Sequence, residues 1–236
     1  MKYAILTTPT LHHLYFVQSL SELSPPALII NENNSFKPNF DTFHAFEAER
    51  EDYELKFWFN QGKPDFQDFA PVQDVESINQ VQVMDSLIQL QPDLIIVFGT
   101  GKIKPELISL FPNKIFNLHG GDPQTYRGLD SHLWAIYHGD FSGLVTTLHR
   151  LNSVLDDGDI VLQSDIELEK NLPLYALRQR NTEVCVCLSR ALLALQGQNT
   201  IVSYQQRAKG RYYSFMPSCL KSVCLKKFEK YTGQMT

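Results

Sequence analysis

Long apolar runs and an excess of basic charge are both missing from this chain of 236 residues. No segment approaches the roughly 20 consecutive apolar residues of a membrane span, and the apolar run at the N-terminus is too short for a signal peptide. The formal net charge is −5, which gives no electrostatic footprint for nucleic acid. We therefore expect a cytoplasmic protein that binds neither nucleic acid nor a membrane.

Cysteine is also scarce, and the four cysteines do not form a metal-binding pattern. Cys185 and Cys187 are two positions apart in a predicted helix, where they cannot share a face. Cys219 and Cys224 have no histidine nearby in the sequence. We expect reduced, structural cysteines and no metal site, since a chain of this length can bury a sizeable core without one.

The glycines of a dinucleotide-binding fingerprint are absent from the first predicted loop, residues 7–13. We therefore expect no nicotinamide or flavin cofactor held through that fingerprint. The chain also shows no internal repeat, low-complexity segment or domain linker. It is predicted to form a catalytic domain over residues 1–200 and a C-terminal extension, with a strand or loop and a final helix, over residues 201–236.

Short apolar runs alternate with amphipathic segments along the first 200 residues. This pattern predicts an α/β fold, with a Rossmann-like, mainly parallel sheet that carries helices on both faces. Asp41 is the expected cap of the second helix. The predicted strands are 3–6, 27–30, 94–98, 115–116, 144–151 and 160–167. The first predicted helix follows the loop at 7–13 and ends near residue 23. The other predicted helices cover about 41–60, 79–90, 131–137, 173–195 and 217–231.

Aromatic side chains at helical spacing are assigned to the core. They lie on the helices predicted over 41–60 and 131–137: Phe43, Phe46, Tyr53, Phe57, Trp58 and Trp134.

Two predicted strands end in polar or glycine-bearing segments. The strand at 94–98 stops at Gly99, and the strand at 115–116 runs into Asn117 and His119. Ligands of open α/β sheets collect at the carboxyl ends of the strands. Asp156 follows at a later junction between apolar segments, so the sequence predicts an amide, an imidazole and a carboxylate in one site.

These three groups have complementary chemistry. A neutral His119 can accept a proton from an attacking amine, while Asp156 would orient the ring and stabilise its cation. The Asn117 amide can donate to an oxygen that becomes negative in a tetrahedral intermediate. Because no activated serine or cysteine lies near the histidine, the group suits acyl transfer to an amine, or hydrolysis with water as nucleophile. The alternative is that Asn117 and His119 cap a turn and Asp156 is a turn carboxylate.

Three motifs give the chain a family resemblance over about residues 1–195. They are Asn117-Leu118-His119, Tyr126-Arg127-Gly128 followed by His132, and His149 separated by six residues from Asp156-Asp157-Gly158-Asp159-Ile160. With them the chain resembles the N10-formyltetrahydrofolate-dependent formyltransferases, which include phosphoribosylglycinamide formyltransferase, the catalytic domain of methionyl-tRNA formyltransferase and the sugar N-formyltransferases. The resemblance implies the family's Rossmann-like formyltransferase fold, with Asn117, His119 and Asp156 as catalytic residues. His132 and His149 are either substrate contacts or structural histidines.

The co-substrate implied by this resemblance is N10-formyltetrahydrofolate. The folate would lie beside the strand ends, with backbone after the 94–98 strand holding its pterin and the loop at 153–158 closing over it. The implied folate-binding residues are Phe98, Gly99, Thr100, Gly101, Lys102, Ile103 and Asp157.

The segment 210–217 looks like the tails of sugar N-formyltransferases, whose substrates are amino-deoxy sugars linked to dTDP or GDP. Its aromatic rings could stack on a base while Lys209 or Arg211 meets a diphosphate, or the rings could pack the tail onto the core. His12 and His13 lie in a loop expected at the rim of the site, and their alternative role is structural. Asp122 and Asp130 could contact an amine or hydroxyl of the sugar. The predicted substrate-binding residues are His12, Asp122, Tyr126, Arg127, Lys209, Arg211 and Tyr212.

The resulting hypothesis is a homodimeric sugar N-formyltransferase, of the kind used in lipopolysaccharide O-antigen biosynthesis. One alternative keeps the folate but changes the acceptor to another small amine, such as glycinamide ribonucleotide, or to water. A second alternative is a folate- or nucleotide-sugar-binding protein that has lost catalysis. A tRNA substrate is disfavoured by the chain length and the charge.

Overall fold

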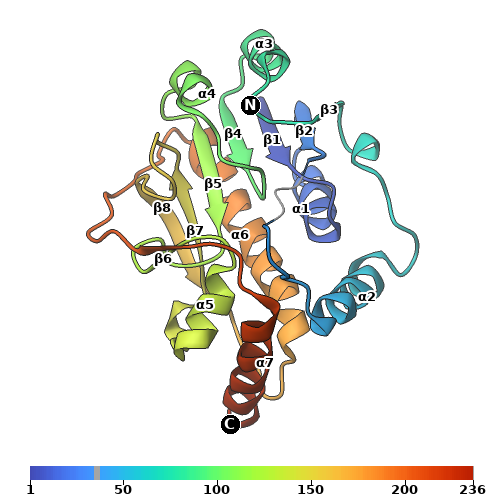
Figure 1. Ribbon diagram of the computed structural model, residues 1–236. Coiled ribbons are helices and arrows are strands. Elements are labelled where there is room, and N and C mark those ends of the chain that lie inside the picture. The colour runs from blue at the N-terminus through green and yellow to red at the C-terminus, as the bar shows by residue number, and fades with distance from the viewer. Residues whose placement is uncertain (35–37, 236) are drawn as a thin grey trace.

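A sheet of seven strands crosses the described part of the computed structural model, which covers residues 1–34 and 38–235 (Figure 1). The strand order is β3-β2-β1-β4-β5-β7-β8. The first five strands in this order are parallel to one another, and β7 pairs in antiparallel fashion with both β5 and β8. The predicted α/β class and mainly parallel sheet are therefore confirmed. The strands are β1 Tyr3–Thr7, β2 Leu28–Glu32, β3 Val72–Val75, β4 Leu94–Val97, β5 Ile115–His119, β7 Val145–Arg150 and β8 Ile160–Asp165.

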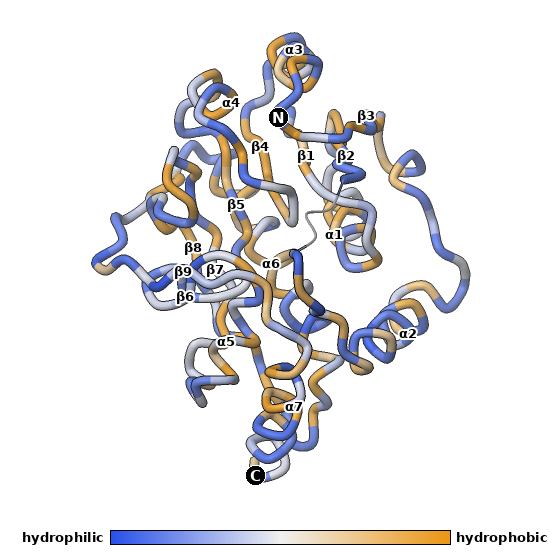
Figure 2. The backbone as a smooth tube through the Cα atoms, in the orientation of Figure 1, coloured by the Kyte–Doolittle hydropathy of each residue, from blue (hydrophilic) through white to orange (hydrophobic). Residues whose placement is uncertain are grey.

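Helices cover both faces of this sheet, which explains why β1 is buried along its whole length. Tyr3 and Ile5 face one apolar core, and Ala4 and Leu6 face another, because successive side chains of a strand point to opposite faces. The apolar residues therefore gather along the central strands in Figure 2. The first core packs against α1 Leu11–Ser21 and α6 Leu177–Gly197, and the second against α3 Val81–Leu90 and α4 Pro105–Leu110.

A third apolar core lies around the C-terminal helix and the segment that follows β5. It joins Phe46 of α2 Ala45–Phe59, Tyr126 of β6 Tyr126–Gly128, Ile136 of α5 Ser131–His138 and Phe228 of α7 Ser218–Gly233. The extension is thus packed onto the catalytic region.

The extension also pairs with this region through a parallel two-stranded ribbon of β6 and β9 Arg211–Tyr213. Gly128 adopts a φ of +95°, and a Cβ there would lie 2.1 Å from the carbonyl oxygen of Tyr213. Only glycine tolerates both that backbone conformation and that close approach.

Several predicted boundaries need correction. Asp41 does not cap α2, because His44 does so by accepting the Phe46 amide while Glu47 accepts the His44 amide, which forms a capping box. β3 and α4 were not predicted, and α1 begins early enough to include His12 and His13, which were expected in a loop. The short 3₁₀ helices are η1 Phe66–Asp68, η2 Phe141–Gly143 and η3 Leu174–Ala176.

The assignment of helical aromatics to the core is only partly right. Phe46 is buried, but Phe43 is 65% exposed and Phe57 is 52% exposed, because α2 packs through one face only. Trp134 is half-buried, and its indole N–H donates to the Ser214 carbonyl.

All four cysteines are free, with Cys185 and Cys224 buried and Cys187 and Cys219 exposed.

Candidate functional site

The site is built at the carboxyl ends of β4 and β5, which are parallel neighbours as predicted. Asn117 and His119 are in β5 itself, so they do not cap a turn. The antiparallel strand β7 pairs with β5 and places His149 opposite Asn117. Asp156 follows β7, and the structure brings these four side chains together. We call Asn117, His119, His149 and Asp156 the polar cluster.

The imidazole of His119 is oriented by a backbone carbonyl. Its Nε2 lies 2.7 Å from the Tyr126 oxygen and must carry the proton that it donates. Nδ1 therefore carries the lone pair and faces Asp156 Oδ2 at 3.8 Å. The expectation that Asp156 orients the ring is corrected, because Tyr126 does so and the carboxylate is placed to stabilise the protonated ring.

The Tyr126 side chain, predicted to bind substrate, is buried and donates from its hydroxyl to Asp140. Tyr126 contributes to the site through its backbone carbonyl, which accepts the hydrogen bond from His119.

Burial and mutual charge set the protonation states of the two partners. Burial lowers the pKa of His119, while the Asp156 charge and the Tyr126 carbonyl raise it in opposition. Burial by itself would raise the pKa of Asp156, but the contact with His149, the positive charge of His119 and His149 when they are protonated, and the Gly128 amide lower that pKa to about 2. Near neutral pH the site therefore offers a neutral imidazole facing an ionised carboxylate.

His149 connects the amide to the carboxylate. It is fully buried, and its Nδ1 donates to the Arg150 carbonyl at 2.9 Å. Its Nε2 then accepts from Asn117 Nδ2 at 3.1 Å and lies 3.7 Å from Asp156 Oδ1. This contact leaves Asn117 one amide hydrogen for a ligand. Of the two roles left open for His149, these contacts favour the structural one.

The loop that carries Asp156 is held from two sides. Asp156 has a φ of +49°, and its Oδ2 accepts from the Gly128 amide at 2.8 Å. Gln206 of the extension donates to the carbonyls of Asp156 and Gly158, both at 2.9 Å. Gln206 carried no sequence signal, because its part depends on the return of the extension to this loop.

The segment predicted to bind folate follows β4 and lies between α1 and α3. Gly99 has a φ of +83°, and a Cβ there would lie 2.1 Å from the His13 ring. The Gly101 amide donates to Glu32 Oε2 at 2.7 Å, and Asn79, just before α3, donates to the Lys102 carbonyl at 3.0 Å. Glu32 and Asn79 were missed by the sequence analysis, and they fix this backbone.

The side chains of the same segment differ in exposure. Those of Phe98 and Ile103 are buried, while Thr100 and Lys102 are not.

Apart from Tyr126, the predicted substrate residues fall into three groups. His12 and Arg127 belong to the site: the His12 ring lies edge-on to Phe98 at 5.7 Å, and the buried Arg127 lies 3.7 Å from Asp157. Asp122 holds a turn by accepting the Gln124 amide. The remaining three are on the extension and point largely into solvent: Lys209, Arg211 and Tyr212.

The rings of the extension partly pack on the core. Tyr213 stacks on Trp134 with 5.0 Å between ring centroids, whereas Tyr212 is 58% exposed. The packing alternative therefore holds for Tyr213.

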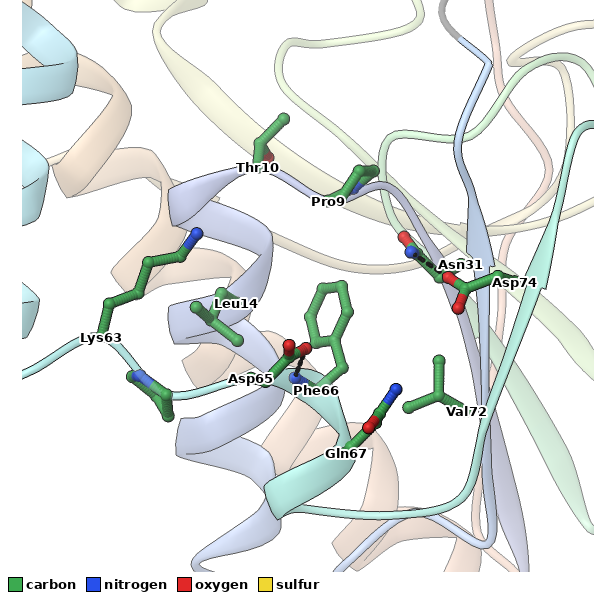
Figure 3. Close-up of a pocket in the computed structure, with 11 residues that line it drawn as sticks. Pro9, Thr10, Leu14, Asn31, Lys63, Asp65, Phe66, Gln67, Val72 and Asp74 are labelled. Carbon is green, nitrogen blue, oxygen red and sulfur yellow. Dashed lines mark hydrogen bonds between the residues drawn. The ribbon is translucent and has the colours of Figure 1, made fainter.

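A cavity of about 290 Å³ lies apart from the polar cluster, between α1, η1 and the ends of β2 and β3 (Figure 3). Asn31 donates to Asp74 at 2.6 Å in its wall, opposite Lys63. Among the predicted site residues, none lines it.

Two further features are absent from residues 1–34 and 38–235. No helix there has the length and apolar character to span a bilayer. No group of three or more histidine, cysteine, aspartate or glutamate side chains in this part is arranged to hold a metal ion.

Comparison with known proteins gives matches to one family. A family model described as "Formyl transferase" matches residues 25–187, more than half of the chain. Methionyl-tRNA formyltransferase of Alkaliphilus oremlandii is 27% identical over 145 residues, which are 61% of this chain and 46% of that protein. The chain spans half or less of the length of the curated relatives it matches.

Solved structures share the fold. Phosphoribosylglycinamide formyltransferase of Anaplasma phagocytophilum matches with a TM-score of 0.63 and 14% identity, over 92% of this chain and 99% of that one. The formyltransferase PseJ of Anoxybacillus kamchatkensis matches with a TM-score of 0.54 and 19% identity, over 99% and 92%. The N-formyltransferase of Helicobacter canadensis matches with a TM-score of 0.58 and 14% identity, over 91% and 71%.

Proposed function

The chain belongs to the formyl transferase family, and from this premise we propose that it moves a formyl group from N10-formyltetrahydrofolate to the amine of a nucleotide-linked amino-dideoxy sugar. The observation that carries the proposal is the geometry of the polar cluster. A neutral His119 presents its Nδ1 lone pair beside an ionised Asp156, and Asn117 keeps a free amide hydrogen.

These groups have defined roles in the proposed reaction. The amine nitrogen attacks the formyl carbon, and His119 Nδ1 accepts the proton that the amine loses. The Asn117 amide donates to the oxyanion of the tetrahedral intermediate. Collapse breaks the bond between that carbon and N10, and the proton passes from His119 to the departing tetrahydrofolate. Asp156 stabilises the imidazolium in between, because it lies 3.8 Å from the nitrogen that is protonated.

The co-substrate and the acceptor are supported by proteins of the same fold. The PseJ structure contains tetrahydrofolate and a UDP-linked formamido sugar, and the Helicobacter canadensis structure contains folinic acid and dTDP-3-aminofucose. We assign the folate to the backbone after β4 together with Asp157, and the acceptor to the His12 side of the cleft. A homodimeric state, the cytoplasm and a place in lipopolysaccharide O-antigen biosynthesis stay predictions.

Formyl transfer is tested with purified protein, N10-formyltetrahydrofolate and a panel of UDP-, dTDP- and GDP-linked 3- and 4-amino-dideoxy sugars. Mass spectrometry of the products identifies the acceptor that is formylated. Glycinamide ribonucleotide belongs in the panel, because a glycinamide ribonucleotide formyltransferase shares the fold. Tetrahydrofolate release with every acceptor unchanged would favour hydrolysis, and no turnover of folate would favour a binding protein.

His119→Ala is expected to lower kcat by about 10³-fold, because the general base is removed. The control is His138→Ala, whose exposed ring contacts only Tyr213 by hydrogen bond among the described residues. Circular dichroism establishes that both variants are folded. Near-normal turnover in a folded His119→Ala protein would contradict the assigned role.

A further inference from the structure

Arg50 of α2 is a largely buried cation with too few partners. Its side chain is 18% exposed, and Nε is buried without a hydrogen-bond partner among the described residues. Its one hydrogen bond within the described residues is long, at 3.4 Å from Nη2 to Glu47 Oε1. A guanidinium has five N–H donors, and burying them without acceptors costs free energy. Arg50 is therefore prepared to receive an acceptor from outside the chain.

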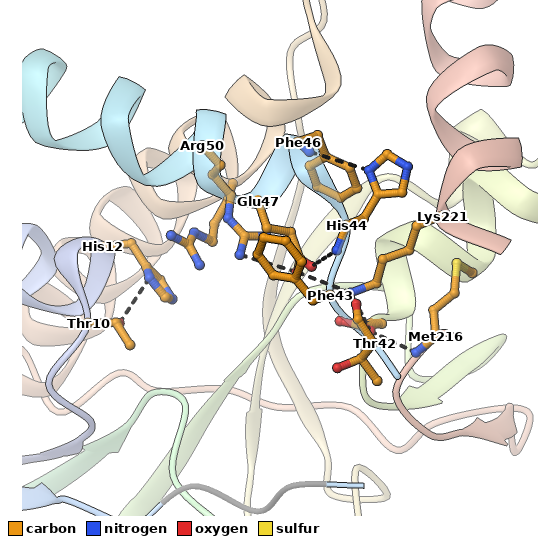
Figure 4. A network of polar contacts seen from close by, with 12 residues as sticks. Thr10, His12, Thr42, Phe43, His44, Phe46, Glu47, Arg50, Met216 and Lys221 are labelled. Carbon is orange, nitrogen blue, oxygen red and sulfur yellow. Dashed lines mark hydrogen bonds and ion pairs between the residues drawn. The ribbon is translucent and has the colours of Figure 1, made fainter. Parts of the chain in front are cut away.

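The carboxylates around Arg50 are already engaged. Glu47 Oε1 also accepts from Lys221 Nζ at 3.1 Å, and Glu47 Oε2 accepts the His44 amide at 2.9 Å (Figure 4). Glu54 accepts two hydrogen bonds from Arg178, at 2.7 and 2.5 Å. Arg50 therefore shares Glu47 with Lys221 and has no hydrogen bond to Glu54.

Arg50 lies near His12, at the start of α1. Figure 4 places it between His12 on one side and Glu47 and Lys221 on the other. Burial lowers the pKa of His12, and the charges of His13, Arg178 and Arg50 lower it further, which indicates a positive potential at this end of α1. The His12 ring contacts Phe98 at the end of β4, the strand next to Asn117 and His119.

We propose that Arg50 binds the diphosphate of the nucleotide-linked substrate; this rests on the proposed function. Diphosphate oxygens accept charge-assisted hydrogen bonds from a guanidinium. A cavity of about 300 Å³ beside Arg50, with the exposed Phe43 ring in its wall, leaves room for the nucleoside. This assignment replaces Lys209 and Arg211, which lie on the exposed extension, as the main diphosphate contact.

The anionic glutamate tail of folate is another group that Arg50 could bind. The position of Arg50 argues against binding of this tail. Arg50 is on α2, which packs with the outer side of α1, whereas the backbone assigned to folate lies between α1 and α3, with Lys102 bound by Asn79 on the α3 side. The two substrates would therefore approach the polar cluster from different sides.

The test compares Arg50→Met with Arg50→Lys and with Arg180→Met, which removes an exposed arginine paired with Glu169. We expect KM for the nucleotide sugar to rise about 10- to 100-fold in Arg50→Met, less in Arg50→Lys and not in Arg180→Met. KM for N10-formyltetrahydrofolate should stay unchanged. The methyl glycoside of the same amino sugar, which has no diphosphate, should react equally with wild type and Arg50→Met.

A binding measurement separates this proposal from the proposed function. Calorimetry with UDP, dTDP, GDP and inorganic pyrophosphate needs no turnover. Weaker binding to Arg50→Met than to wild type supports the diphosphate site even if no sugar is formylated. Equal binding to both proteins, no binding to wild type, or a rise in KM for folate alone would overturn the site, even if formyl transfer is observed.

Discussion

The pairing of His119 with Asp156 determines what each residue can do. Asp156 is ionised because the Gly128 amide, the contact with His149 and the charge of the two histidines when protonated outweigh its burial, and its pKa falls to about 2. His119 is neutral near pH 7 because burial lowers its pKa, although the Asp156 charge opposes that shift. His119 can therefore accept a proton near pH 7, as the proposed reaction requires.

Asp156→Asn should change the pH profile as well as the rate. The carboxylate raises the pKa of His119, so its removal should move the acid limb of kcat/KM to lower pH. Loss of imidazolium stabilisation should lower kcat/KM by about 100-fold or more. The profile is measured between about pH 5 and 9 with one acceptor, so that the ionisation of the substrate is common to both proteins. An acid limb that stays in place or moves to higher pH would count against the pairing.

At the scale of secondary-structure elements, α2 is held to the start of α6 by a buried ion pair. The Glu54 carboxylate is fully buried and accepts two hydrogen bonds from Arg178. Because α2 also carries Arg50 and its first turn contacts Lys221 of α7, this ion pair helps to fix the position of Arg50.

Arg178→Met should lower the free energy of unfolding by about 3–5 kcal/mol, because it leaves the Glu54 carboxylate buried and unpaired. Arg180→Met, two residues along the same helix, removes an exposed pair and should cost less than about 1 kcal/mol. Urea denaturation followed by circular dichroism measures both changes. Adding Glu54→Leu to Arg178→Met should restore part of the loss, and equal stabilities of the two single variants would refute the explanation.

At the scale of the whole molecule, buried neutral histidines make folding sensitive to mild acid. Burial lowers the pKa of His13 to about 3 and of His132 to about 4, against an ordinary value near 6.5. The unfolded chain therefore binds more protons than the folded protein between pH 6.5 and about 4. The contribution of these neutral histidines to the free energy of unfolding is fully present above pH 6.5, and it is lost as the pH falls through that range. The Asp156 contribution is lost at lower pH, from about 4 to about 2.

His132→Gln should flatten this acid dependence. Glutamine can keep the hydrogen bond that His132 Nε2 donates to the Val145 carbonyl at 2.7 Å, but it does not titrate. The melting temperature of wild type should fall between pH 6.5 and 4, and that of the variant should fall less. Parallel melting curves for the two proteins across that range would contradict this account.

The sequence by itself determined the class of the fold and the three residues at its centre. Buried strands and amphipathic helices have distinct periodicities, so β1, β4, β5, α3 and α5 could be predicted from local pattern. Asn117 and His119 could be singled out because a strand runs directly into them. Short elements such as β3 and α4, and the cap of α2, escaped because a few residues carry too weak a local signal.

Only the tertiary structure decided how the site is completed. The antiparallel pairing of β7 with β5 places His149 against Asn117, and the returning extension places Gln206 on the Asp156 loop. The packing of α2 against α1 and the start of α6 leaves Arg50 short of acceptors among the described residues. These contacts join residues far apart in the chain, and they depend on strand pairing and packing, which the periodicity of one segment does not encode.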